Sequence, residues 1–189
     1  SRTRPAVRAV AFSWPRLARP ATYRLAARYA RPVRRRPVDA VLAGIAVARQ
    51  SGIRVILDPA PAPQVVPAGL LDVDAVCPNE SEAAAILGCR IASVDEAMQA
   101  AGELQRLGAR NAVITLGEQG AVVCDEEGRV RRVPSVVVNA IDTTAAGDAF
   151  AAALGVFWTA GRPLAEAVQF ACCAGALAAS RPGAQPAMP

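Results

Sequence analysis

Hydrophobic residues recur at helical spacing, or form long apolar runs, in five segments of the chain. Helices are therefore expected over residues 38–52, 79–87, 93–107, 149–160 and 163–180. Shorter runs rich in β-branched residues predict strands at residues 53–57, 75–77, 111–116, 121–124, 129–133 and 136–138. Because a helix that leads directly into a buried strand implies a parallel sheet, this order predicts an α/β fold.

The first 36 residues have a different character from the rest of the chain. They hold 11 of the 21 basic residues and none of the 16 acidic ones, so residues 37–189 carry 10 − 16 = −6. Four prolines interrupt any sustained helix there, Pro5, Pro15, Pro20 and Pro32. We predict that residues 1–36 form a separate disordered segment, either a leader or the product of a shifted reading frame. A nucleic-acid-binding or membrane-binding arm and an organelle transit peptide are alternatives.

Composition excludes several classes of site. The chain has no His, which rules out zinc sites built on His and triads that need an imidazole base. Its five Cys have no CxxC spacing, so we expect reduced core residues in a cytoplasmic protein. No apolar run is long and uniform enough to predict a membrane span.

A loop with several small residues connects the run 136–138 to the helix predicted from residue 149. Ala145, Ala146 and Gly147 would let the backbone approach a ligand closely, and a helix start offers unpaired N–H donors and a partial positive charge. A phosphate is the natural ligand of such a place. Asp148 would lie beside it and could accept a proton from a hydroxyl that attacks phosphorus. The spacing indicates phosphoryl transfer, although Gly and Asp at a helix start are also common as capping residues.

Two further motifs have an ordinary structural interpretation. Asn79 and Glu82 have the spacing of a capping box at the start of the helix 79–87. Gly117 and Gly120 lie between two predicted strands and are typical of a tight turn.

The nonapeptide from Asp142 to Phe150 resembles the second signature of the pfkB-type sugar kinases. Together with Gly183-Ala184-Gln185-Pro186, it is similar to the ribokinase branch of that family. The resemblance covers Pro37 to Pro189. It implies a ribokinase-like three-layer sandwich with a mostly parallel central sheet, of which this chain would lack the N-terminal half and the β lid.

The resemblance also implies roles for individual residues. Asp148 would be the catalytic base, and Glu82 would act on Mg²⁺ through water. ATP and the anion hole would involve Asn79, Thr115, Leu116, Gly117, Gly120, Ala145, Ala146, Gly147 and Cys172. A monovalent cation, K⁺, would be held by Asp142, Thr144, Ala178, Arg181 and Gly183, mainly through backbone carbonyls.

The implied reaction is ATP-dependent phosphorylation of D-ribose to ribose 5-phosphate. Because the groups that bind the sugar are missing, we expect weak or no turnover by this chain. A nucleotide-binding fragment or pseudoenzyme and another pfkB-type sugar kinase are the alternatives. The family tends to form homodimers through the lid that is absent here, and we expect neither a membrane nor a nucleic acid as partner.

Overall fold

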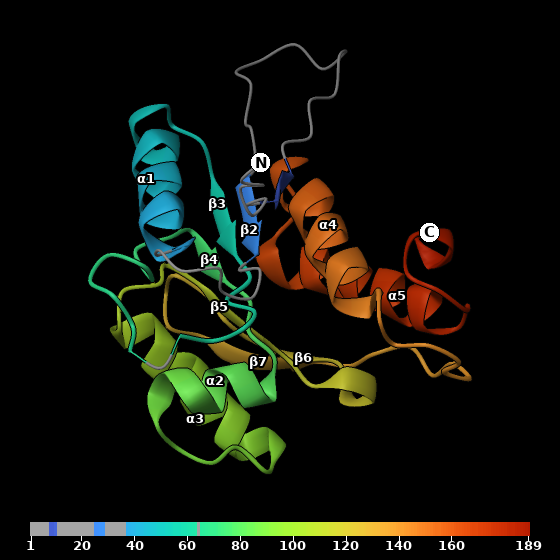
Figure 1. Cartoon of the computed structure of the whole chain (residues 1–189). Coiled ribbons are helices and arrows are strands. Elements are labelled where there is room, and N and C mark those ends of the chain that lie inside the picture. The colour runs from blue at the N-terminus through green and yellow to red at the C-terminus, as the bar shows by residue number, and fades with distance from the viewer. Residues whose placement is uncertain (1–7, 11–24, 29–36, 64) are drawn as a thin grey trace.

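A seven-stranded mixed sheet runs through the computed structural model, which describes residues 8–10, 25–28, 37–63 and 65–189 (Figure 1). The strands follow one another in sequence order across the sheet. They are β1 (Arg8–Val10), β2 (Leu25–Arg28), β3 (Val55–Leu57), β4 (Ala75–Val76), β5 (Ala112–Thr115), β6 (Ala121–Cys124) and β7 (Val130–Val133). Strands β2 to β5 are parallel, whereas β1, β6 and β7 pair antiparallel to their neighbours. The α/β class is confirmed.

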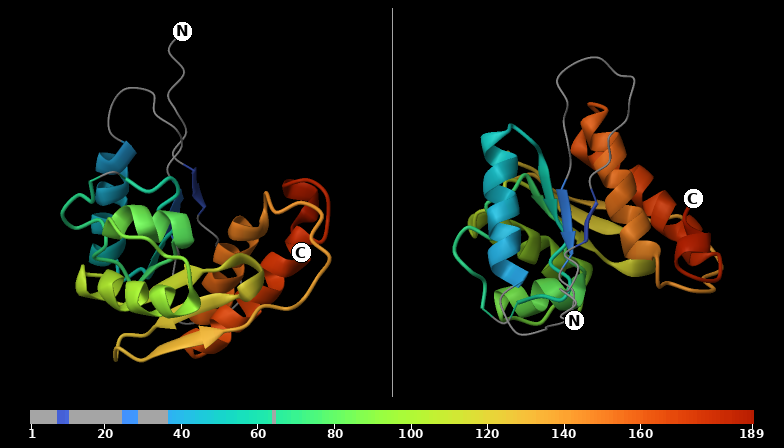
Figure 2. Two further views of the ribbon diagram at one scale, coloured as in Figure 1. Left: turned by 90° about the horizontal axis from the view of Figure 1, so that it is seen from below. Right: turned by 45° about the horizontal axis from the view of Figure 1, so that its top comes forward.

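Helices cover both faces of this sheet. They are α1 (Pro37–Gln50), α2 (Glu80–Leu87), α3 (Val94–Arg106), α4 (Ala146–Thr159) and α5 (Leu164–Ala179), with short 3-10 helices η1 (Gly117–Gln119) and η2 (Gln185–Ala187). Helices α1, α2 and α3 lie on one face, and α4 and α5 lie together on the other (Figures 1 and 2). This arrangement gives three layers, as predicted.

Alternation along the strands produces the two cores. Leu57 and Ile114 pack into the cluster under α1 to α3, while Ile56 and Val113 pack against α4 and α5. All four side chains are at most 2% exposed. Because successive residues of a strand point to opposite faces, a strand between two helical layers must be apolar on both sides. The continuous apolar runs seen in the sequence have this cause.

The expected helix starts at residues 79 and 93 are present. Asn79 caps α2 and Ser93 caps α3, each accepting a hydrogen bond from the backbone N–H three residues later. The capping box at α3 is not ideal. The Glu96 carboxylate accepts from Ala92 N, at 2.5 Å, whereas an ideal box would use the N–H of Ser93.

The strand expected at residues 136–138 is wrong. Val136 is 47% exposed and Val137 is 97% exposed, and both lie in an irregular segment. That segment runs alongside α5 and is hydrogen-bonded to it. Gln169 Nε2 donates to Pro134 O at 3.1 Å, and Ile141 N donates to Ala179 O at 2.7 Å. β-branched residues favour strands only where a neighbouring strand and a buried face are available. The helix predicted from residue 149 also begins three residues earlier, at Ala146.

The expectation that residues 1–36 lie outside the fold falls mostly beyond the described residues. Two short segments within that range are described, however, and both are strands of the sheet, with β2 parallel to β3. The expectation of five core cysteines also needs correction, because Cys89 follows the last turn of α2 and is exposed.

Candidate active site

The carboxyl ends of β4 and β5 bring two of the sequence motifs together. Asn79 and Thr115 form a parallel β-bridge just beyond the two strands, and Thr115 N donates to Pro78 O at 3.0 Å. The start of α2 and the Gly-x-x-Gly turn therefore lie at the same edge of the sheet. Ligands of open parallel sheets bind at this carboxyl edge.

The start of α2 forms a complete capping box. Glu82 N donates to Asn79 Oδ1 at 2.9 Å, and Asn79 N donates to Glu82 Oε2 at 2.9 Å. The Ser81 hydroxyl donates to the same Asn79 oxygen at 2.7 Å. These bonds hold the Glu82 carboxylate in one place, at the surface and beside the end of β5.

The turn after β5 is rigid because of its second glycine. Leu116 N donates to Gly120 O at 2.8 Å, which closes the turn around η1. Gly120 has φ +95°, and a Cβ there would lie 2.1 Å from Val133 O. Gly117 also has positive φ, at +57°, but no atom lies within 4 Å of a Cβ built there. Only glycine fits at residue 120, whereas residue 117 requires glycine mainly for its dihedral angle.

Helix α4 points its start toward the same edge. Arg54 immediately precedes β3, and its Nη1 donates to Trp158 O at 3.0 Å while its guanidinium lies 4.2 Å from the centre of the Trp158 ring. The last turn of α4 is thus fixed at the amino end of β3. Because α4 rises about 18 Å over twelve residues, its first turn lies toward the opposite, carboxyl end of the strands.

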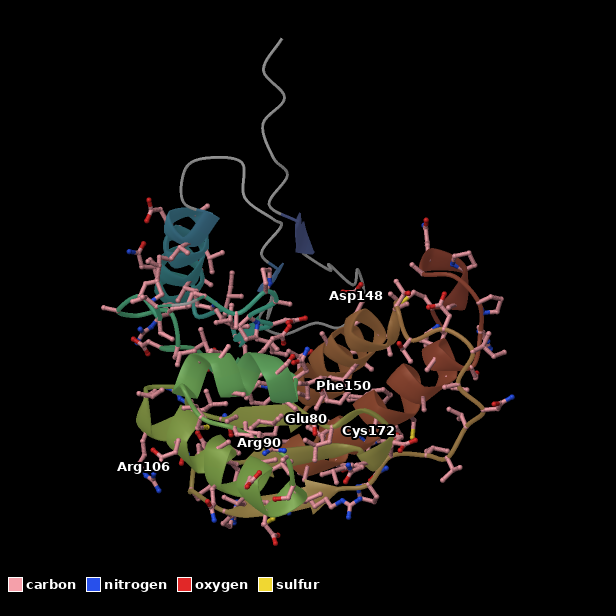
Figure 3. The ribbon with its side chains drawn as sticks, turned by 60° about the horizontal axis from the view of Figure 1, so that its bottom comes forward. Glu80, Arg90, Arg106, Asp148, Phe150 and Cys172 are labelled. Carbon is pink, nitrogen blue, oxygen red and sulfur yellow. The ribbon has the colours of Figure 1, made fainter. Side chains whose placement is uncertain are left out.

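The first turn of α4 contains the small residues predicted for an anion hole. Ala145 is buried, Ala146 is half-buried and Gly147 is exposed. Ala146 N is bonded to Thr143 O at 3.1 Å, and the next N–H groups belong to a helix start, where intrahelical acceptors are lacking. Asp148 is half-buried at this end of the helix (Figure 3).

Asp142 organises the loop that enters α4. Its Oδ1 accepts from Thr144 Oγ1 at 2.6 Å and from Thr144 N at 3.0 Å, and its Oδ2 accepts from Gly183 N at 3.0 Å. The hydroxyl of Thr144, followed by the two backbone N–H groups, lowers the pKa of the Asp142 carboxyl. The carboxylate is therefore kept ionised, and it ties the α4 loop to the loop after α5.

That second loop contains the other residues proposed for the cation. Arg181 N donates to Ala178 O at 3.2 Å, and Asp142 N donates to Ala179 O at 3.1 Å. The structure thus brings together Asp142, Thr144, Ala178, Arg181 and Gly183, although the Arg181 side chain is exposed. No group of three or more His, Cys, Asp or Glu side chains suited to a metal occurs within the described ranges, so a cation here would depend on backbone oxygens.

Helix α5 connects these places. Near its start, Gln169 binds Pro134, whose carbonyl carbon lies 2.7 Å from the position of a Cβ on Gly120. Near its end, Ala179 accepts the backbone of the Asp142 loop. Between them, Gly175 faces Ala146 O in the first turn of α4. Sequence reasoning missed Gln169 and Gly175, but a glycine in the middle of a predicted helix was a usable signal.

Cys172 lies in the core rather than on an open surface. It is 5% exposed and packs in the cluster between the sheet and the pair α4–α5, as does Phe150 (Figure 3). Burial, and then the neighbouring Cys173 thiol, raise the pKa of Cys172 to about 11. A contact between this side chain and adenine is therefore limited to its small exposed part.

Two open cavities lie at the other edge of the sheet, where the strands begin. Their volumes are about 430 and 570 Å³, and Arg54, Asp74 and Arg110 line both. The residues proposed for ATP line neither of them. The candidate site is thus a surface at the carboxyl edge, separate from the two cavities.

The model of the pfkB family of carbohydrate kinases matches residues 7–189. The chain belongs to this family. The match begins before Pro37 and so includes much of the segment that we expected to be separate from the domain. Among the described residues, no helix is long and apolar enough to cross a membrane.

Known proteins of the family match most of this chain. The ribokinase of Haemophilus influenzae is 34% identical over 154 residues, which is 81% of this chain and 50% of that protein. The structure of Arabidopsis thaliana ribokinase complexed with ribose and ATP has a TM-score of 0.76 at 28% identity, over 81% of this chain and 50% of that one. Phosphofructokinase-2 from Escherichia coli, in complex with potassium, has a TM-score of 0.68 at 25% identity, over 85% and 51%. The pfkB-family chain spans about half the length of these relatives.

Proposed function

We propose that this chain carries the nucleotide half-site and the catalytic base of an ATP-dependent sugar kinase, with D-ribose as the acceptor. The observation that carries the proposal is the start of α4. Its small, partly exposed residues Ala146 and Gly147 stand directly before Asp148, at the edge of the sheet that also holds the Gly117–Gly120 turn. Phosphate binding and proton acceptance would thus take place within one helical turn.

The backbone of the α4 start would bind the transferred phosphoryl group. The unpaired N–H groups of a first turn and the partial positive charge of a helix N-terminus favour an anion. These donors are already oriented before reaction, because the Asp142 carboxylate ties the loop to Gly183. Preorganised donors stabilise developing charge without further reorganisation.

Asp148 would accept the proton of the attacking sugar hydroxyl. Its carboxylate lies in the first turn of α4, next to the backbone N–H groups that would hold the phosphoryl group. General base catalysis of this type contributes about 10²–10⁴-fold to a rate.

The donor groups at the carboxyl edge and in the Asp142 loop fit ATP, Mg²⁺ and K⁺. Glu82 offers a fixed carboxylate near the turn at Gly117, suited to a water ligand of Mg²⁺. The Asp142 carboxylate and the backbone carbonyls near Ala178 are hard oxygen groups, and such groups could hold K⁺. Bound Mg²⁺ would supply charge neutralisation between the phosphates.

The choice of ribose rests on relatives and not on sugar contacts. The Haemophilus influenzae relative is a ribokinase and the Arabidopsis thaliana structure is a ribokinase with ribose, whereas another structure of similar fold is a phosphofructokinase. A nucleotide-binding chain without sugar turnover is the second candidate. It is favoured because the motif residues that lie together at the carboxyl edge and in the Asp142 loop are those proposed for phosphate and cations.

The test is ADP release by the purified chain with ATP, Mg²⁺, K⁺ and D-ribose, and in parallel with D-fructose or adenosine. Asp148→Asn should lower ribose-dependent turnover by about 10²–10⁴-fold. Asp95→Asn is the control, since Asp95 is likewise an acid in the first turn of a helix, α3, and is exposed.

Ribose-dependent turnover that both variants retain would reject Asp148 as the base. If the wild-type chain shows no turnover but ATP raises its melting temperature, the nucleotide-binding alternative is correct. Faster turnover with fructose or adenosine would show that this acceptor, and not ribose, is the substrate.

A further inference from the structure

Helix α5 approaches the first turn of α4 most closely at Gly175. A Cβ built on Gly175 would lie 3.2 Å from Ala146 O and 3.7 Å from Phe150 Cβ. The first of these distances is shorter than ordinary van der Waals contact, and the atom it meets belongs to the backbone. A side chain at residue 175 would therefore push against the backbone of Ala146 itself.

The surroundings of this contact leave little room for adjustment. Ala145, Ala149, Ala178 and Ala187 form a buried cluster between the start of α4, the end of α5 and η2, with exposed fractions of 0–3%. Alanine has no rotatable side chain that could yield, and closely packed interiors transmit strain. A displacement at Gly175 would thus move the turn that contains Ala146 and Gly147.

Glycine at this position also conflicts with the local secondary structure. Gly175 lies in the interior of α5, a helix of 16 residues, where glycine costs more conformational entropy than alanine. Sites at which a local rule is broken are often those where function requires it. The close approach to the α4 start is the feature that glycine permits here.

We propose that Gly175 is a positioning residue that sets the place of the first turn of α4, and with it the backbone donors of the anion hole and Asp148. This inference rests on the proposed function, since it assigns to Gly175 the alignment of the phosphate-binding turn. Gly175 acts through Ala146 and touches no reacting atom.

The test compares two glycine substitutions in helix interiors. Gly175→Ala introduces the 3.2 Å contact, whereas Gly102→Ala, in α3, meets nothing closer than Arg106 Nη2 at 4.0 Å. Both gain the same helix propensity, so their difference reports the contact alone. The affinities for Mg·ATP and for adenosine are measured by calorimetry, together with the melting temperature.

We expect Gly102→Ala to bind both ligands as the wild type does. A shift of a few tenths of an ångström weakens the hydrogen bonds from the first-turn N–H groups to the charged phosphate, so Mg·ATP affinity should fall roughly tenfold. Adenosine, which lacks phosphates, should bind Gly175→Ala with unchanged affinity. A role in packing alone would lower both affinities together.

Equal Mg·ATP affinity of Gly175→Ala and the wild type would overturn the proposal. So would a parallel loss of adenosine affinity, or a Gly175→Ala chain without a melting transition, because either would indicate a requirement of the fold. If the wild-type chain binds Mg·ATP no more tightly than adenosine, the anion hole is rejected. The proposed function and this inference would then both fail. The failure of the inference alone leaves wild-type Mg·ATP binding intact.

Discussion

The two edges of the sheet are built from different interactions. At the carboxyl edge, caps, turns and close backbone contacts position Asn79, Gly120 and the start of α4. At the amino edge, arginines pair with carboxylates around two open cavities. The pairs there are Arg49–Asp72, Arg110–Asp74, Arg129–Asp125, Arg131–Asp125 and Arg162–Glu166.

This difference explains why the two open cavities do not coincide with the candidate active site. Five arginines at the amino edge are paired with carboxylates, which leaves less of their charge for a ligand. Arg54 instead contacts Trp158 and fixes the end of α4. At the carboxyl edge, by contrast, a first helical turn leaves backbone donors for a bound anion. A phosphate site can thus be a shallow surface of oriented N–H groups.

The largest effect on stability is expected at the carboxyl edge, from Gly120→Ala. A Cβ at this position would overlap Val133 O at 2.1 Å, and the backbone has φ +95°. The hairpin of β6 and β7 would have to move, so we expect a loss of more than about 3 kcal/mol in the free energy of unfolding. Urea denaturation followed by circular dichroism measures it.

Gly117→Ala is the matched control for this change. Gly117 also has positive φ, at +57°, but no atom lies within 4 Å of its built Cβ. The cost should be only the dihedral strain, about 1–2 kcal/mol. Equal losses in the two variants would contradict the steric explanation.

A smaller effect, dependent on pH, is expected at the amino edge from Asp125→Asn. Burial alone would raise the pKa of Asp125, but hydrogen bonds from the Arg129 backbone and guanidinium, and the charge of Arg131, lower it overall. A lowered pKa adds stability above the unfolded value near 3.9, and this stability is lost as the pH falls through the folded value. The variant should lose about 1 kcal/mol at pH 7, because the Arg129 side chain is largely exposed and screened.

Urea denaturation at pH 7 and pH 3 checks this expectation. The difference between wild type and Asp125→Asn should shrink at pH 3, and also at pH 7 in 1 M salt. Glu127→Gln, which removes the exposed partner of Arg129, should change the free energy by less than about 0.5 kcal/mol. A difference that is the same at both pH values would show that Asp125 acts by packing, and Mg·ATP affinity should not change in either variant.

Sequence alone predicted the parts of the molecule that depend on local rules. The Asn79–Glu82 box and the helices α1, α2, α3 and α5 follow from capping residues and apolar periodicity, and their starts agree within one or two residues. The run 136–138 was misassigned because its β-branched residues suggest a strand, while the actual neighbour is α5. Such long-range neighbours are not encoded in a local pattern.

The candidate site was predictable as a list of residues but not as an arrangement. Family resemblance supplied the residues from Asp142 to Asp148, and the structure adds how Asp142 connects two loops through Gly183. The contact between Gly175 and Ala146 joins segments about 30 positions apart, so only the packing of α4 on α5 reveals it. The same reason hid two long-range ion pairs of the amino edge, Arg49–Asp72 and Arg110–Asp74.

The smallest effect on stability is expected for Glu82→Gln, which separates two roles of one side chain. Glu82 Oε2 accepts from Asn79 N at 2.9 Å, and a glutamine amide oxygen can accept the same bond. The free energy of unfolding should therefore change by less than about 0.5 kcal/mol, whereas Asn79→Ala should lose about 1 kcal/mol with its cap.

The second role of Glu82, in binding Mg²⁺, depends on the negative charge that glutamine lacks. If the Glu82 carboxylate holds a water ligand of Mg²⁺, Glu82→Gln should need several-fold more Mg²⁺ for half-maximal ATP binding, with the cap intact. A titration of ATP binding against Mg²⁺ concentration at constant ionic strength measures this. An unchanged midpoint would leave capping as the sole role of Glu82, because the substitution removes the charge and keeps the hydrogen bond. The carboxyl edge would then bind phosphate through backbone donors without help from this carboxylate.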